Sequence, residues 1–328
     1  MAAPRKIFLP NKVYFVSTRI EEGLPLIPVL LMKTLIWSAI ARAYIQYPQG
    51  IIAVKVQGNH IHLILRCISP QTFPLFVGFI KQEITHYINR LLGRKQKRIW
   101  VSGYDSPIFL TSDKVIDRLG YIFTISLKDN LVASLDEDPY ISTLDLLSSE
   151  NPNPTVSCYL IPRDAVTSVA NPDALNKTSD SYLQSLLEDE HPLKFELPIE
   201  PFGFKDCFLD TKHLSLEELE KLIHASVTHH TEQATAERGK ASVIGRKRLL
   251  LQSILKAFIP KKFGKKMICM SSDIEERKTY ISWHRVISER AKEVYQRWKK
   301  LDFSVPFPLG AFPPSGIYRG SLLEIMLV

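Results

Sequence analysis

Two short apolar runs that meet at a turn constrain the fold of this chain more than any other stretch. Residues 50–66 read Gly-Ile-Ile-Ala-Val-Lys-Val-Gln-Gly-Asn-His-Ile-His-Leu-Ile-Leu-Arg, with a turn signal at Gln57-Gly58-Asn59. β-Branched residues on both sides of such a turn predict two neighbouring antiparallel strands. Side chains alternate between the two faces of a strand, so His60 and His62 are expected on one face and Ile61 on the other, in a core.

Two imidazoles side by side form half of a divalent-metal site. The same His-X-His spacing also occurs by chance on strand surfaces that bind nothing. Spacing alone therefore leaves both interpretations open, and the surrounding chain has to decide between them.

Composition narrows the class of protein. The chain has 328 residues, of which 45% are hydrophobic, and this length predicts two domains or one domain with a long extension. A net charge of +8 favours an anionic partner, either nucleic acid or an acidic membrane face. The four cysteines lie far apart and form no CxxC pair, which argues against a zinc knuckle or a disulfide framework and favours a reducing cytoplasm.

No stretch has the pattern of a membrane span or signal peptide. The most apolar segment, Leu24 to Ile45, is interrupted by Lys33 and Arg42, so it fits a core helix better than a transmembrane helix. The apolar run within residues 1–12 is too short for a signal peptide. We expect a cytoplasmic protein without a membrane partner.

The first 130 residues predict an α+β fold. The expected elements are a strand over 12–20, a helix over 28–44, the two strands of 50–66, a helix over 73–92, a strand over 99–110 and a helix that starts at 111–113. The order β-α-β-β-α-β matches a ferredoxin-like antiparallel sheet with its helices on one face. With the second and third strands central, both histidines would lie in the middle of the open sheet face.

The second half of the chain divides by charge. Residues 133–200 contain 13 acidic and 3 basic residues, so the remainder carries +18. A solvated linker with short helices is the simpler interpretation, and a mimic of nucleic-acid charge that covers a basic face is the alternative. We predict a first domain over 1–142, an acidic Ser/Pro-rich linker over 143–214 and a basic, mainly helical extension over 215–328.

Several features of the extension are specific. Ser215-Leu-Glu-Glu218 is a capping-box pattern at the start of a long polar helix toward Lys240, on which His229 and His230 are expected in solvent. Residues 246–266 carry eight Lys/Arg and no acid, and residues 275–300 predict an amphipathic helix.

A dense basic run follows the helix over 73–92. Its residues are candidates for DNA-backbone contact, although a charge run is often only a solvated face: Arg90, Arg94, Lys95, Lys97 and Arg98.

A tyrosine on the helix after residue 111 is a candidate nucleophile. Val115, Leu119 and Ile122 form its buried stripe, and Tyr121 lies about 100° around the helix from Ile122. A tyrosine that attacks a phosphodiester conserves the bond energy in a covalent protein–DNA link. The alternative role for Tyr121 is a partly buried packing residue, and Tyr87 and Tyr104 are weaker candidates on an apolar helix face and a probable strand.

Residues 6–142 resemble the HUH single-tyrosine transposases, and especially the REP-associated tyrosine transposases. The similarity lies in Gly58-Asn-His-Ile-His-Leu-Ile-Leu65, in the following helix from Phe79-Ile-Lys81 through Tyr87-Ile-Asn89 to Arg94, and in the segment from Tyr121-Ile122 to Pro139-Tyr140. The resemblance implies a metal-dependent DNA strand-transferase. His60 and His62 would then be ligands of Mg²⁺ or Mn²⁺, and Tyr121 would attack single-stranded DNA near a hairpin to form a 5′-phosphotyrosine.

The chain departs from this family one helical turn after the tyrosine. The family usually places there an Asn or Gln that completes the metal shell, followed by proline, whereas this chain has Ile125 and Ser126. Isoleucine cannot coordinate a metal, so water, Asp129 or a weaker two-histidine shell would have to serve.

Three hypotheses follow. The first is an active enzyme that cleaves and rejoins hairpin-associated DNA, and the second is a catalytically weakened hairpin-binding or regulatory protein of the same fold. A basic structural or membrane-surface protein would leave His60, His62 and Tyr121 unexplained. The DNA target and the oligomeric state are open.

Overall fold

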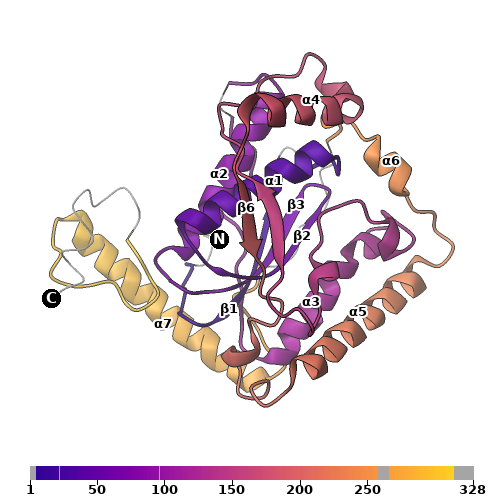
Figure 1. Cartoon of the computed structure of the whole chain (residues 1–328). Coiled ribbons are helices and arrows are strands. Elements are labelled where there is room, and N and C mark those ends of the chain that lie inside the picture. The colour runs from indigo at the N-terminus through magenta and orange to yellow at the C-terminus, as the bar shows by residue number, and fades with distance from the viewer. Residues whose placement is uncertain (1–4, 22, 96, 258–265, 314–328) are drawn as a thin grey trace.

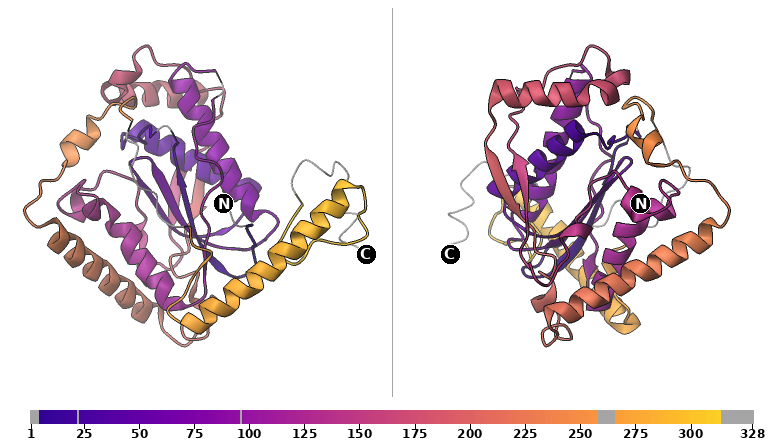
Figure 2. Two further views of the ribbon diagram at one scale, coloured as in Figure 1. Left: turned by 180° about the vertical axis from the view of Figure 1, so that it is seen from behind. Right: turned by 45° about the vertical axis from the view of Figure 1, so that its right-hand side comes forward.

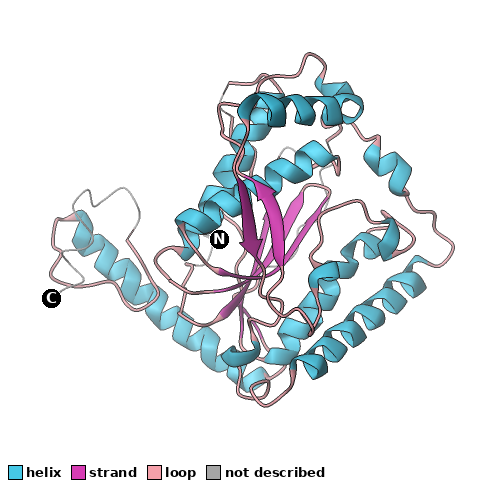
Figure 3. Cartoon of the chain, in the orientation of Figure 1, coloured by secondary structure: helices cyan, strands magenta, loops and turns pink. Residues whose placement is uncertain are grey.

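The computed structural model describes residues 5–21, 23–95, 97–257 and 266–313. The expected α+β architecture is confirmed (Figures 1 and 3). The first elements in chain order are β1 (Val13–Arg19), α1 (Leu30–Gln46), β2 (Gly50–Gln57), β3 (His60–Arg66), α2 (Phe73–Leu91), β4 (Ile108–Phe109) and α3 (Ser112–Lys128). Gly58 has a φ of +53° at the turn between β2 and β3, a conformation that suits glycine. No helix of the described residues is long and apolar enough to cross a membrane.

The central sheet has the strand order β2-β3-β1-β4-β7. β3 pairs with β1 and β2, and β1 with β4, all antiparallel. Strand β7 (Cys269–Met270) from the C-terminal half joins β4 in parallel, so the sheet is mixed and the expectation of a purely antiparallel one is wrong. β2 lies at the edge rather than centrally, and the strand expected over 99–110 shortens to two residues plus single bridges at Trp100 and Asp105.

Helices cover both faces of the sheet, which corrects the expected one-sided arrangement. Ile61, Leu63 and Leu65 of β3 belong to one core with α1 and α2, and Ile64 belongs to a second core with α3 and α5 (Leu216–Arg238). Because β3 alternates its side chains, His60 and His62 share the face of Ile64, toward α3. The histidine face is thus partly roofed by a helix.

The acidic segment packs into the folded body. It forms a two-stranded sheet of β5 (Thr155–Tyr159) and β6 (Lys194–Pro198) and a helix α4 (Leu175–Glu190), which lie against α1 (Figure 2). Cys158, Leu183 and Leu197 are buried in the same core as α1 and α2. The expected solvated linker is therefore wrong for this segment, because its apolar residues are spaced to cover α1.

The C-terminal half is mainly helical, as expected. The capping box of Ser215 and Glu218 starts α5, and α5 runs beside α3 (Figure 1). The remaining described helices are α6 (Arg246–Leu250) and α7 (Ile274–Lys299), together with short 3-10 helices at Leu135–Glu137, Leu144–Leu146, Pro172–Ala174 and Lys205–Cys207. Part of the basic run predicted over 246–266, residues 258–265, lies outside the described residues.

Candidate functional site

The two histidines lie together on β3. Gln57 and Lys55 of β2 stand opposite His60 and His62, respectively. The imidazole centroids are 5.8 Å apart with their planes within 7°, and Phe15 of β1 stacks on His62 at 5.6 Å. The predicted shared face is confirmed, and the pair lines a groove rather than the interior of an apolar core.

Burial keeps both imidazoles neutral. It lowers the pKa of His60 to about 4, with a smaller effect from Arg19, and the pKa of His62 to about 3, with smaller effects from His60, Arg118 and Lys55. His62 Nδ1 is buried and has no hydrogen-bond partner among the described residues. A neutral imidazole has a free lone pair, the form that coordinates metals.

Tyr121 opens into the same groove from α3. Its ring is half-buried, whereas Leu119 and Ile122 beside it are in the core, as the helical stripe predicted. The groove has a volume of about 470 Å³. We name it the histidine groove. Its floor is formed by β1 and β3 with Phe15, Arg19, His60 and His62. One wall is α3 with Arg118, Tyr121 and Ile125, followed by its C-cap Asp129, and the other is the loop Val101–Asp105.

Arg118 connects the tyrosine to the histidines, and sequence reasoning missed it. Its guanidinium carbon is 4.7 Å from the Tyr121 ring centroid and 5.0 Å from that of Phe15, which stacks on His62. Burial lowers the pKa of Arg118 from its ordinary, very high value, and its Nε atom has no hydrogen-bond partner among the described residues. Arg118 lies one turn before Tyr121, so its position at i−3 was a signal for a charge on the same helix face.

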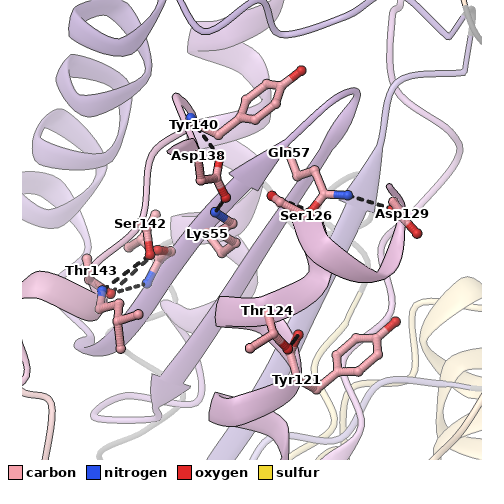
Figure 4. A network of polar contacts seen from close by, with 12 residues as sticks. Lys55, Gln57, Tyr121, Thr124, Ser126, Asp129, Asp138, Tyr140, Ser142 and Thr143 are labelled. Atoms are coloured by element: carbon pink, nitrogen blue, oxygen red, sulfur yellow. Dashed lines mark hydrogen bonds and ion pairs between the residues drawn. The ribbon is translucent and has the colours of Figure 1, made fainter. Parts of the chain in front are cut away.

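The position of a third metal ligand is filled by apolar and amide groups. Ile125 is 8% exposed, and the Ser126 hydroxyl bonds to Gln57 Oε1 at 3.2 Å. Gln57 Nε2 donates to Asp129 at 2.5 Å, as Figure 4 shows, while burial raises the pKa of Asp129 and the Gln57 hydrogen bond lowers it. Within the described residues, no three side chains of His, Cys, Asp or Glu gather as they would around a metal ion. The chain thus fits a divalent ion through two imidazoles only.

The predicted basic run does not line this groove. Arg90 pairs with Asp164 at 2.7 Å, and Arg98 pairs with Glu21 at 3.2 Å. The five basic residues from Arg90 to Arg98 are absent from the groove lining, whose cationic residues are Arg19, Arg118 and Lys266. DNA contact by all five residues, Arg90, Arg94, Lys95, Lys97 and Arg98, stays a prediction.

The sequence predicted that His230 lies in solvent, and the structure shows that this prediction is wrong. Its Nε2 is 3.0 Å from Asp117 Oδ1, and its ring meets the edge of Tyr121 with centroids 6.1 Å apart. His229 beside it is exposed. The C-terminal extension therefore contacts the candidate nucleophile directly.

Comparison with known proteins gives one distant likeness. No family model matches the chain, and no curated protein matches it. One solved structure that it resembles is a REP-associated tyrosine transposase bound to a REP hairpin, with a TM-score of 0.40 and 18% sequence identity over 45% of this chain and 85% of that one.

Proposed function

We propose that this chain binds DNA and uses Tyr121 to cleave and rejoin a single strand beside a hairpin. The observation that carries the proposal is that Tyr121, Arg118 and the His60–His62 pair open into one groove, although they come from α3 and β3. Nucleophile, positive charge and metal-binding imidazoles are the parts that phosphodiester transfer requires.

Each residue has a distinct task in this reaction. The Tyr121 oxygen attacks a 5′-phosphate, its bond to phosphorus forms while the bond to the 3′ oxygen breaks, and the tyrosine proton is released as the leaving oxygen gains one. Arg118 donates to the non-bridging oxygens, which a planar guanidinium recognises in a bidentate manner. Attack by a 3′-hydroxyl on the phosphotyrosine reverses the step and rejoins DNA.

A divalent ion held by His60 and His62 would neutralise negative charge on the attacked phosphate. Two imidazoles without a carboxylate form a donor set that suits Mn²⁺ better than Mg²⁺, which prefers oxygen ligands. The buried and neutral state of both rings keeps them ready to hold the ion at neutral pH.

A second candidate function is hairpin binding without catalysis. Ile125 favours it, because the helix offers an aliphatic side chain where a third ligand would complete the metal shell. A regulatory protein that retained the groove and lost the metal would have this sequence.

Covalent capture decides between the two. We incubate the full chain with an end-labelled single-stranded hairpin DNA and Mn²⁺ and look for a protein–DNA adduct on a denaturing gel. The enzyme is expected to form an adduct that Tyr121→Phe abolishes without loss of DNA binding, since only the attacking oxygen is removed. Tyr295→Phe on α7, a residue that does not line the groove, is the matched control and should leave the adduct unchanged.

Ile125→Asn tests whether the metal shell of His60 and His62 lacks only a third ligand. The substitution places an amide oxygen on the same helix face and should raise metal-dependent adduct formation. If the wild type forms no adduct and Ile125→Asn creates none, the catalytic proposal fails and DNA binding alone stands.

A further inference from the structure

A smaller cavity shares a wall with the histidine groove. Its volume is about 80 Å³, and it lies between the N-terminal segment with Arg5 and Lys6, the loop 102–106, residues 266–268 and α7. The loop residues 102–105 line both the cavity and the groove. A group bound in the cavity would therefore lie next to a strand bound in the groove.

Basic side chains outnumber acidic ones in the lining of the cavity. Arg5, Lys6 and Lys266 line it, and Asp105 is the one carboxylate among its lining residues. The Lys6 ammonium lies over the ring of Tyr104. The Lys81 ammonium is 5.9 Å from the centroid of the same ring and donates to the carbonyls of Val101 and Gly103. Two amines thus converge on one tyrosine with little acidic compensation.

Burial disfavours the ammonium form of both lysines, and a bound anion would offset this penalty. The pKa of Lys6 falls to about 6 because of burial and, less, because of Lys81 and Lys266, with Asp105 acting in the opposite sense. Burial likewise lowers the pKa of Lys81 to about 8, with Arg98 adding to the effect. The buried Tyr104 hydroxyl has no hydrogen-bond partner among the described residues, and burial raises its pKa, so it stays a donor.

We propose that Lys6 and Tyr104, which both line the cavity, form a subsite for a backbone phosphate of the DNA strand that occupies the histidine groove. The inference rests on the DNA binding proposed above and names where the strand continues. At roughly 10–15 Å³ for each water-sized group, the cavity accommodates the five heavy atoms of a phosphate but not a base with its sugar. Because residues 102–105 line both the cavity and the groove, a strand bound in the groove would hold its own phosphates next to the cavity. We therefore assign the cavity to a phosphate of that strand and not to a free anion.

The test measures the salt dependence of DNA affinity. We titrate the full chain, without divalent metal, into a fluorescent single-stranded oligonucleotide at several salt concentrations and follow anisotropy. Lys6→Met should weaken binding roughly threefold to tenfold and flatten the slope of log K against log salt by about 0.7, the loss of one phosphate contact on single-stranded DNA. Lys221→Met, an exposed lysine paired with Glu217 on α5, is the control and should change neither.

Tyr104→Phe keeps the proposal falsifiable if Lys6→Met perturbs folding. It removes one hydroxyl and should weaken binding by roughly twofold to tenfold, as loss of a single hydrogen bond does, with an unchanged melting temperature. Unchanged affinity and slope in both folded variants would overturn the subsite, and so would an absence of DNA binding.

Inorganic phosphate distinguishes the source of the anion. If phosphate raises the melting temperature of the wild type but not of Lys6→Met, while the DNA slope is the same in both, the cavity binds free phosphate and the proposal is wrong. Catalysis and the subsite can fail separately. A Lys6-dependent slope without an adduct contradicts catalysis alone, and an adduct with an unchanged Lys6→Met slope contradicts the subsite alone.

Discussion

At the scale of single residues, a column of stacked groups organises the histidine groove. Arg118 lies over Phe15, Phe15 stacks on His62 and His62 stacks on His60. Each group fixes the orientation of the next, and the guanidinium at one end also faces Tyr121. Burial in this column is the reason that both imidazoles stay neutral.

The neutral histidines make stability depend on pH. Their folded pKa values of about 4 and 3 lie below the ordinary 6.5, so the folded state binds fewer protons than the unfolded state. Their contribution to stability is complete above pH 6.5 and is lost as the pH falls toward 4 for His60 and toward 3 for His62. At pH 5 each histidine lowers the free energy of unfolding by up to about 2 kcal/mol relative to its value at neutral pH.

Urea unfolding in EDTA at pH 7 and pH 5 measures this loss. His62→Asn should reduce the difference between the two free energies of unfolding, and His229→Asn, an exposed histidine, should not. An equal pH dependence in wild type and His62→Asn would contradict the buried neutral state.

At the scale of elements, α5 of the C-terminal extension holds the helix that carries Tyr121. A Cβ atom added at Gly120 of α3 would lie 2.2 Å from Ser226 Oγ and 2.8 Å from the Ser226 backbone carbon. The two helices therefore approach each other at a glycine, next to the His230–Asp117 contact at 3.0 Å. The position of the tyrosine depends on a segment more than a hundred residues away in sequence.

Gly120→Ala tests this contact. The added methyl group meets backbone, so α3 has to move, and we expect the free energy of unfolding to fall by about 1–3 kcal/mol. Gly78→Ala in α2 is the control, because nothing lies within 4 Å of its added Cβ and alanine should stabilise that helix by about 0.5–1 kcal/mol. Equal effects of the two substitutions in a urea titration would show that α3 and α5 are not in close contact.

At the scale of the whole molecule, the acidic segment is attached to the core through buried charge. Glu83 of α2 has a fully buried side chain, and it pairs with Arg42 of α1 at 3.3 Å and with Arg163 of the acidic segment. Arg42 also donates to the carbonyl of Ile161, as does Tyr87. One carboxylate therefore joins two helices and the loop that follows β5 in the acidic segment.

Glu83→Gln should loosen this attachment. Two arginines lose their counter-charge, and because they are partly exposed we expect a cost of about 1–3 kcal/mol, less than for a fully buried pair. Limited trypsin digestion should then cut faster at Arg163, which fragment masses identify. Glu188→Gln on the exposed face of α4 is the control, and equal rates of cleavage would contradict the role of Glu83.

The sequence by itself determined what depends on neighbouring residues. The period of two on a strand placed His60 and His62 on one face, and the period of 3.6 on a helix kept Tyr121 off the buried stripe. The capping box at Ser215 predicted the start of α5 for the same reason, since each pattern follows from local backbone geometry.

Tertiary structure alone decided which distant segments meet. Composition predicted a solvated acidic linker, yet the apolar residues of that segment found a partner surface on α1. Charge density predicted DNA contact at Arg98 but gave no sign of Arg118, which lies in the groove because α3 packs across Phe15. Such contacts depend on shape and charge at long sequence separation, and no local periodicity records them.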